Sequence, residues 1–217
     1  MKHIALIITL IIALTACSPD AEPTRTIERG EVIYTNTFDD PTSWETFGLL
    51  DTQFGIQDGV YNAISNGGGY IPVSNGVTHS NVVIEATTSL VSGSDDTIYG
   101  VMCRMQQANP SVGYYFLING AGQYGIRIGE GSRLRVFVPW TDHPAVKTGQ
   151  NSSNTLRVVC VDDYFAFYIN DRFVAEATDN WLSEGTMGFA LTGTSGTNNA
   201  VTFDDVTIWD AQLTDTE

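Results

Sequence analysis

The side chains best able to carry out chemistry in this chain are carboxylates, and several of them stand in adjacent pairs. These pairs are Asp39-Asp40, Asp95-Asp96, Asp162-Asp163 and Asp204-Asp205. Consecutive residues of an extended strand point to opposite faces, so none of these pairs forms a catalytic dyad by itself. A glycosidase needs two carboxyl groups roughly 5–5.5 or 6.5–9.5 Å apart. No strand-like run of the sequence supplies two acids spaced along one face, and Glu85 stands alone in its run.

Other catalytic motifs are absent from the sequence. There is no Gly-x-Ser-x-Gly string, no His-Glu-x-x-His string and no P-loop. His79 and His143, the histidines beyond the N-terminal segment, lie in loop-like stretches. The sequence therefore favours a protein without catalytic activity, with an enzyme as the alternative.

The first 17 residues have the pattern of an export signal. Lys2 precedes an apolar run at residues 4–14, which is shorter than the roughly 20 residues that span a bilayer. The string Leu14-Thr15-Ala16-Cys17 resembles the bacterial lipobox, in which the cysteine is acylated and becomes the new N-terminus. The resemblance implies a signal peptide at residues 1–16 and a membrane anchor of acyl chains on Cys17. With Ser18 after the cysteine, we expect a lipid-anchored, extracytoplasmic protein of the cell envelope, at the outer membrane or the cell surface.

A polar stretch separates this cysteine from the rest of the chain. Residues 17–30 contain two prolines and almost no apolar side chain, so we expect a flexible tether there. Residues 31–217 have a length that suits one domain with its own core.

The mature chain is strongly acidic. The full sequence has a formal net charge of −15, and loss of Lys2 with the signal leaves nine basic residues against 25 acidic ones, a net charge of −16. Nucleic acid is therefore excluded as a partner, because its binding depends on clustered Lys and Arg. The acidic residues serve mainly for solubility, with calcium or a neutral sugar as possible ligands.

Two cysteines remain beside Cys17 in a compartment that we expect to be oxidising. Cys103 and Cys160 stand in alternating apolar runs, at residues 99–105 and 156–160, so both point to an apolar face. We predict that they form a disulfide, with two inert buried thiols as the alternative.

The folded region consists of strand-like runs separated by turn residues. No segment has sustained helical periodicity, and turn strings such as Asp58-Gly59, Asn75-Gly76 and Asn170-Asp171 tolerate positive φ. These features predict an all-β fold, a two-sheet antiparallel β-sandwich of the jelly-roll type. The expected strands lie at residues 31–38, 81–90, 97–105, 113–119, 123–128, 133–138, 155–161, 164–170, 172–178, 186–191 and 200–209.

Residues 38–209 resemble the concanavalin A-like, laminin G-like jelly-roll superfamily. The resemblance is carried by N-T-L-R-V-V-C-V-D-D-Y-F-A-F-Y-I-N-D-R-F-V-A at residues 154–175, by Y-G-V-M-C-R at 99–104, and by the closing strands at 185–208. Asp171 stands where the pattern usually has glycine. This superfamily includes lectins, carbohydrate-binding modules, adhesive domains and glycoside hydrolases, so the resemblance implies the fold more narrowly than the activity.

The repeated string Thr-Phe-Asp-Asp gains meaning from this resemblance. In such folds the first and last strands commonly lie side by side, which would bring Asp39 and Asp40 close to Asp204 and Asp205. Oxygen ligands of this kind suit Ca²⁺, and related jelly rolls hold a structural calcium near their joined termini. We therefore expect a structural Ca²⁺ site there, with strand-ending turns as the alternative.

Sugar recognition in these folds uses exposed aromatic rings, assisted by polar side chains. The candidate ligand-binding residues are Trp140, Tyr115 (or Tyr114), Tyr124, Arg104 and Arg127. Tyr124 and Arg127 fall on opposite faces of one strand, so at most one of them belongs to a given surface. Trp44, Trp181 and Trp209 are expected in the core.

The leading hypothesis is a non-catalytic, lipid-anchored jelly-roll module that binds carbohydrate. A structural or adhesive envelope lipoprotein with a protein partner is the second hypothesis. A glycoside hydrolase of the 3-keto-disaccharide type is the third, because such domains share this strand pattern, although no residue motif carries the activity over.

Overall fold

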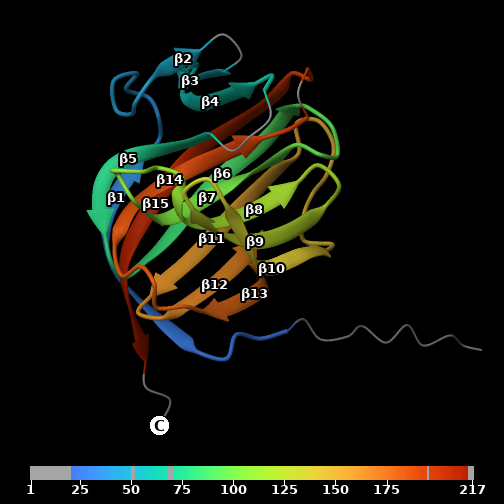
Figure 1. Ribbon diagram of the computed structural model, residues 1–217. Helices are drawn as coiled ribbons and strands as arrows, with labels where there is room; N and C mark the ends of the chain where they lie inside the picture. Colours follow the sequence, from blue (N-terminus) through green and yellow to red (C-terminus); the bar gives the residue numbers. More distant parts are fainter. Residues whose placement is uncertain (1–20, 50–51, 68–70, 195, 215–217) are drawn as a thin grey trace, which may run out of the picture.

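Two antiparallel β-sheets packed face to face form the protein in a computed structural model that describes residues 21–49, 52–67, 71–194 and 196–214 (Figure 1). The predicted signal peptide and Cys17 lie outside the described residues. None of the described residues is helical, so no helix among them could cross a membrane. The strands are β1 (Thr26–Asn36), β2 (Phe47–Leu49), β3 (Thr52–Gln57), β4 (Val60–Ser65), β5 (Ile71–His79), β6 (Val82–Ser92), β7 (Ile98–Met105), β8 (Val112–Asn119), β9 (Gln123–Glu130), β10 (Leu134–Asp142), β11 (Ser153–Val161), β12 (Tyr164–Ile169), β13 (Arg172–Thr178), β14 (Gly185–Thr192) and β15 (Asn199–Thr214).

The two sheets interleave segments that are far apart in the sequence. The nine-stranded sheet has the order β13-β12-β11-β6-β15-β4-β3-β2, with β1 paired to β15, and the six-stranded sheet has the order β10-β9-β8-β7-β14-β5. The first and last strands are therefore neighbours, as the jelly-roll resemblance implied. The predicted all-β, two-sheet jelly-roll architecture is confirmed.

The main core lies between the sheets and follows from the alternation of apolar residues along the strands. Val101, Phe116 and Ile126 of the six-stranded sheet and Ile84 and Val158 of the nine-stranded sheet are all fully or almost fully buried in it. Each central strand sends every second side chain into this layer. A register shift of one residue would therefore move these side chains out of the core to the outer face of the sheet.

Two smaller apolar clusters lie on the outer faces of the sheets. The outer cluster of the nine-stranded sheet contains Val83, Val159, Val161, Tyr164, Ala166 and Ala211, with Ile27, Tyr168, Phe173, Trp209 and Leu213 packed against it. The outer cluster of the six-stranded sheet contains Met102, Met105, Tyr115, Leu117 and Ala190, with Ile98, Leu134 and Trp140 packed against it. Strands that are apolar on both faces explain why parts of the sequence lack a clean alternation.

The prediction missed four strands, β2 to β5, which occupy much of residues 47–79. Outward positions of β3 and β4 hold Gly55 and Asn62, and β5 contains Asn75-Gly76, all poor strand formers. Asn75-Gly76 lies within β5 at a register shift against β14, where Gly76 has a φ of 74°. The predicted positive φ is present at Gly76, but the prediction that Asn75-Gly76 separates two strands was wrong, because the pair forms a bulge inside β5.

The fold also begins earlier than expected. Strand β1 starts at Thr26 instead of Glu31, because Thr26–Arg29 pair with Ala211–Thr214 of β15. Most of these β1 side chains are exposed, so backbone pairing holds the segment and the composition did not reveal it. The expected tether therefore ends before residue 24, where side-chain contacts with the domain begin.

Two tight hairpins are formed as the turn strings indicated. Asp58 and Gly59 have φ values of 55° and 76° between β3 and β4, and Asn170 and Asp171 have 51° and 64° between β12 and β13. These values suit a type I′ turn, whose twist matches that of the flanking strands. Asp171 thus adopts the positive φ that glycine usually supplies.

Candidate functional site

Trp140 and Arg127 lie together on the outer face of the six-stranded sheet. The guanidinium carbon of Arg127 is 4.7 Å from the centroid of the Trp140 ring. Both side chains lie over Gly125, where an added Cβ would be 3.0 Å from Arg127 Nη1 and 3.2 Å from Trp140 Cε3. Arg127 Nη1 donates to the carbonyls of Ile126 and Val138, so the guanidinium is fixed behind the indole. This arrangement holds the ring of Trp140, which is half-buried, in one position.

Neither of the two predicted tyrosines is exposed beside Trp140, although Tyr115 lies on the same sheet face and pairs with Arg127 across β8 and β9. Tyr115 is fully buried in the outer cluster of the six-stranded sheet, and its hydroxyl donates to the carbonyl of Ser111. Tyr124 points into the main core on the opposite face of β9 from Arg127, as alternation predicted, and donates to the carbonyl of Val174 at 2.6 Å. Neither ring is accessible for stacking on a ligand in this arrangement.

The middle of the same sheet face is filled by its own side chains. Met102, Leu117 and Ala190 are fully buried there, beneath the half-buried Ile98, Leu134 and Trp140. An exposed surface begins again at Val136 of β10, which is 58% exposed. A ligand would therefore meet the β10 edge of this sheet rather than a groove across its centre.

A polar hollow of about 470 Å³ lies at the other edge of the six-stranded sheet, beside β5. Its lining includes Glu45, Ser74, Asn75 and Gln107. The Nδ2 atom of Asn75 is buried without a hydrogen-bond partner. Sequence reasoning missed this hollow because residues 42–45, 74–76 and 107–110 meet only through the tertiary fold. The bulge signal Asn75-Gly76 was the one local indication of it.

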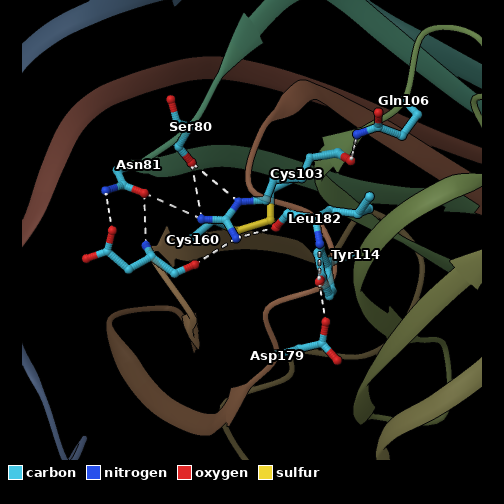
Figure 2. The surroundings of a disulfide bond; sticks show 10 residues. Ser80, Asn81, Cys103, Gln106, Tyr114, Cys160, Asp179 and Leu182 are labelled. Atoms are coloured by element: carbon cyan, nitrogen blue, oxygen red, sulfur yellow. Dashed lines mark hydrogen bonds between the residues drawn. A yellow bond between two sulfur atoms is a disulfide. The ribbon is translucent and has the colours of Figure 1, made fainter.

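Arg104 occupies a different place, at the end of the sandwich next to a disulfide. Cys103 and Cys160 form the predicted disulfide, with Cα atoms 6.8 Å apart (Figure 2). Both cysteines are buried in the main core, so the bond joins β7 of one sheet to β11 of the other. The prediction from their apolar alternation is confirmed.

The Arg104 side chain is buried and binds main-chain oxygens of three separate segments. Its Nη1 donates to the carbonyls of Asp162 at 2.8 Å and Leu182 at 2.7 Å, and its Nε and Nη2 donate to the carbonyl of Ser80 at 3.4 Å. Burial lowers the pKa of Arg104, while Tyr114 and Asp162 nearby raise it. Arg104 is only 2% exposed and joins three segments inside the protein. It does not belong to the surface around Trp140.

Tyr114, the alternative to Tyr115, belongs to this same end of the sandwich. Its hydroxyl donates to Asp179 and accepts from the backbone N–H of Leu182 at 3.3 Å (Figure 2). Burial and the hydrogen bond to Asp179 raise the pKa of Tyr114. The ring is fully buried, so it too is a structural residue.

The tryptophans expected in the core divide into three cases. Trp44 is buried among Phe38, Tyr61 and Phe189, as predicted. Trp209 is half-buried on the outer face of the nine-stranded sheet. The prediction was wrong for Trp181, which is 48% exposed. It lies in the short connection between β13 and β14 rather than in a strand.

The two Thr-Phe-Asp-Asp strings lie just beyond the end of the β1–β15 pairing, which stops at Asn36 and Val206. Phe38 and Phe203 are both fully buried. Burial raises the pKa of Asp204, the hydrogen bond from the Asp205 backbone N–H lowers it, and the charges of Asp205 and Asp39 raise it further. Asp40 instead accepts from the backbone and side chain of Thr42, at 2.9 and 2.7 Å, and so caps a turn. No group of three or more His, Cys, Asp or Glu side chains in the described part of the chain is arranged to hold a metal ion. The predicted calcium site thus has carboxylates near one another, at Asp39, Asp204 and Asp205, but they are not arranged as a set of metal ligands.

No protein-family model matches the sequence, and no curated protein matches it. Solved structures share the fold. A carbohydrate-binding module, CBM66, from Bacillus subtilis is 19% identical, with a TM-score of 0.55 over 79% of this chain and 98% of that one. A Bacillus subtilis protein of unknown function with a galectin-like fold has a TM-score of 0.66 at 12% identity, over 86% of this chain and 99% of that one.

An endo-β-1,3-glucanase from Pyrococcus furiosus is similar to the same extent. It is 12% identical, with a TM-score of 0.56 over 85% of this chain and 95% of that one. The chain therefore has the galectin-like, concanavalin A-like jelly-roll fold, in agreement with the resemblance seen in its sequence.

Proposed function

We propose that the protein is a non-catalytic carbohydrate-binding module, anchored outside the cytoplasm by acyl chains on Cys17. The observation that carries the binding role is the Trp140 ring, held over Gly125 by Arg127 at the edge of a sheet. A fixed indole suits a neutral sugar, because the apolar face of a pyranose packs on an aromatic ring without ordering a mobile side chain. Known structures of this fold include a carbohydrate-binding module.

A neutral glycan fits the charge of the chain better than an acidic one. The net charge of −16 after removal of the signal repels an acidic polysaccharide. Neutral hydroxyl groups can bind the polar atoms beside Trp140 without this cost. The polar hollow beside β5 would also suit a neutral ligand, because Glu45 is the single ionisable side chain among its lining residues.

The placing of the two acids in the strands of the six-stranded sheet supports a non-catalytic role. Strands β7, β8 and β14 contain no Asp or Glu. Strand β9 has Glu130 as its last residue, and Arg135 binds it at 3.0 Å. Asp142 is the last residue of β10 and pairs with Gln123, at the opposite end of the β9–β10 ladder from Glu130. A two-carboxylate glycosidase on this face would have no acid and nucleophile at the required spacing.

The envelope location rests on the apolar run, the lipobox string and the disulfide. A disulfide suits an oxidising compartment. Acyl chains on Cys17 would provide a lasting anchor, because two or more chains bind a bilayer durably where one binds reversibly. Metabolic labelling of Cys17 with palmitate, against a Cys17→Ser control that should remain unlabelled, tests the anchor.

Titration of the acyl-free domain with a panel of neutral polysaccharides tests the binding role. We expect saturable binding to at least one of them, weakened about tenfold by Trp140→Ala, which is the loss of roughly 1.4 kcal/mol. Trp181→Ala is the matched control, because Trp181 is exposed elsewhere and should not contribute. No binding to any polysaccharide, together with capture of an envelope protein, would favour the adhesive alternative. Turnover of a 3-keto-disaccharide would favour the hydrolase.

A further inference from the structure

We infer that the outer face of the nine-stranded sheet, around Arg29 and Trp209, is the surface that the protein lays against the bilayer. This inference rests on the proposed acylation of Cys17. It adds which face of the domain contacts the headgroups, and therefore which face points away from the membrane. Four features of the described residues support it.

The first feature is the path of the chain that follows Cys17. The backbone N–H of Thr24 donates to Glu176 of β13 at 2.8 Å, and Arg25 binds Asp163 at 2.7 Å beside β12. Ile27 then packs on the outer cluster of the nine-stranded sheet. Figure 1 shows this N-terminal segment passing β13 and β12 before it joins β15. The first described residues after the proposed anchor therefore contact this face of the domain.

The second feature is the short distance between the anchor and this face. Six residues lie between Cys17 and Thr24, so the seven residue-to-residue steps of a fully extended chain reach about 25 Å. A tether of this length holds Glu176 and Asp163 close to the headgroup layer. The six-stranded sheet lies on the far side of the main core from the contacts of Thr24 and Arg25, so it is farther from the proposed anchor.

The third feature is a set of arginine side chains stacked on aromatic rings. Arg25 lies 5.3 Å from the Tyr164 ring centroid, Arg29 lies 5.0 Å from that of Trp209, and Arg157 lies 5.6 Å from that of Tyr168. All three rings belong to the outer cluster of the nine-stranded sheet. Aromatic rings and arginines with apolar stems are the side chains favoured at a membrane interface.

The fourth feature is an arginine on this face without an acidic partner among the described residues. Arg25, Arg29 and Arg157 are three of only nine basic residues in the mature chain. Arg25 is paired with Asp163, and Arg157 is paired with Glu85 and Asp171. Arg29 is exposed and has no ion pair within the described ranges, so its guanidinium can bind a lipid phosphate.

A hollow of about 160 Å³ lies beside Arg29. Its lining combines the apolar side chains of Ile27, Val83 and Val159 with Arg29, Arg157 and Tyr168. An apolar floor bordered by cations and a phenol suits the boundary between a phosphate headgroup and an acyl chain. In this arrangement the acyl chains on Cys17 supply the affinity for the bilayer, because the acidic chain as a whole is not attracted to an anionic membrane surface. Arg29 then determines which face of the domain contacts the headgroups.

Tryptophan quenching on vesicles tests this orientation. The acylated chain is reconstituted into vesicles of phosphatidylcholine and phosphatidylglycerol that carry a shallow spin-labelled lipid. The double variant Trp140→Phe, Trp181→Phe reports on Trp209, and the variant Trp209→Phe reports on Trp140 and Trp181, while the buried Trp44 is constant. We expect quenching in the double variant and little in Trp209→Phe. The reverse pattern, or equal quenching of both, overturns the inference.

A charge reversal supplies the second arm. Arg29→Glu should reduce the quenching of Trp209 by roughly twofold or more, because one arginine near an anionic surface contributes about that much or more. Arg133→Glu, an exposed arginine between β9 and β10, is the matched control and should change nothing. Equal effects of both reversals would contradict a role for Arg29 in choosing the face.

Footprinting of the unmodified protein keeps the test independent of variant folding. Hydroxyl radicals should label Trp209 and Tyr168 less on vesicles than in detergent, with Trp181 unchanged. The mass of the intact protein separates the two levels of failure. A protein without acyl mass removes the proposed anchor and this inference with it, whereas an acylated protein with unprotected Trp209 overturns the inference alone.

Discussion

Arg127 lies behind Trp140 with 4.7 Å between its guanidinium carbon and the ring centroid, and both side chains lie over the bare backbone of Gly125. The missing side chain of Gly125 leaves the space that both groups occupy. The position of the Trp140 indole thus depends on Gly125 beneath it. The first prediction follows from this dependence.

Gly125→Ala should weaken glycan binding about fivefold and destabilise the fold by about 1–2 kcal/mol, because the new methyl group forces Trp140 and Arg127 outward. Isothermal titration and urea unfolding measure the two effects. Gly48→Ala is the control, since a Cβ at Gly48 meets nothing nearer than the carbonyl of Thr52 at 3.9 Å. Unchanged binding by Gly125→Ala would show that the position of the indole does not matter.

Removal of the disulfide should lower the free energy of unfolding by about 2–4 kcal/mol, because the bond closes a long loop in the unfolded chain. Cys103 and Cys160 are 57 residues apart in sequence. The double variant Cys103→Ala, Cys160→Ala should unfold at lower urea and lose all dependence on reductant. A wild-type midpoint that does not move with dithiothreitol would contradict this prediction.

Arg104→Met should cost about 2–4 kcal/mol, because the carbonyls of Ser80, Asp162 and Leu182 lose buried donors. Hydrogen exchange should rise in all three segments at once. Arg133→Met, at an exposed position, should change stability by no more than about 0.5 kcal/mol. A loss confined to one segment would mean that Arg104 does not join them.

Asp204→Asn tests the predicted calcium site through its effect on stability. Burial, Asp205 and Asp39 raise the pKa of Asp204 in the folded protein, so the folded state binds this proton more tightly than the unfolded state does. That contribution favours folding at low pH and is lost as the pH rises through the raised pKa. At neutral pH the ionised carboxylate opposes folding, so in EGTA the variant should be stabilised by about 0.5 kcal/mol after allowance for solvent screening.

Added calcium reverses this expectation if the carboxylates bind the ion. Wild-type protein should then melt at a higher temperature with calcium than with EGTA, and Asp204→Asn should lose that gain. An identical wild-type midpoint in both media would remove calcium from this corner. Asp95→Asn, away from the paired strands, controls for a general effect of one charge.

The sequence predicted those features that repeat locally along the chain. Alternating apolar residues placed both Cys103 and Cys160 on an apolar face, where the structure confirms their disulfide, and Asn170-Asp171 marked a hairpin that the structure also confirms. The pattern failed where pairing depends on backbone alone. Thr26–Arg29 form a strand because β15 is long enough to meet them, and their exposed side chains carry no sign of it.

The candidate site was predictable only in part, for a related physical reason. Residue type suggested Trp140 and Arg127, and alternation placed Arg127 on the opposite face from Tyr124. Exposure depends on what covers a strand, which the sequence does not encode locally. Tyr115 is therefore buried beneath its neighbours, and Trp181 is exposed in a short connection. Arg104 was assigned a ligand, although its partners are main-chain oxygens of segments 24 to 78 residues away in sequence.

The pairing of β1 with β15 also decides how the protein responds to mechanical force. Tension from an anchored N-terminus acts first on the contacts of Thr24 and Arg25, and then on the Thr26–Thr214 end of the ladder. These contacts are exposed and give way one after another, whereas Phe38, fully buried beyond the end of β1, resists. Under tension, β1 can thus separate from β15 and lengthen the N-terminal segment while the two sheets stay packed together.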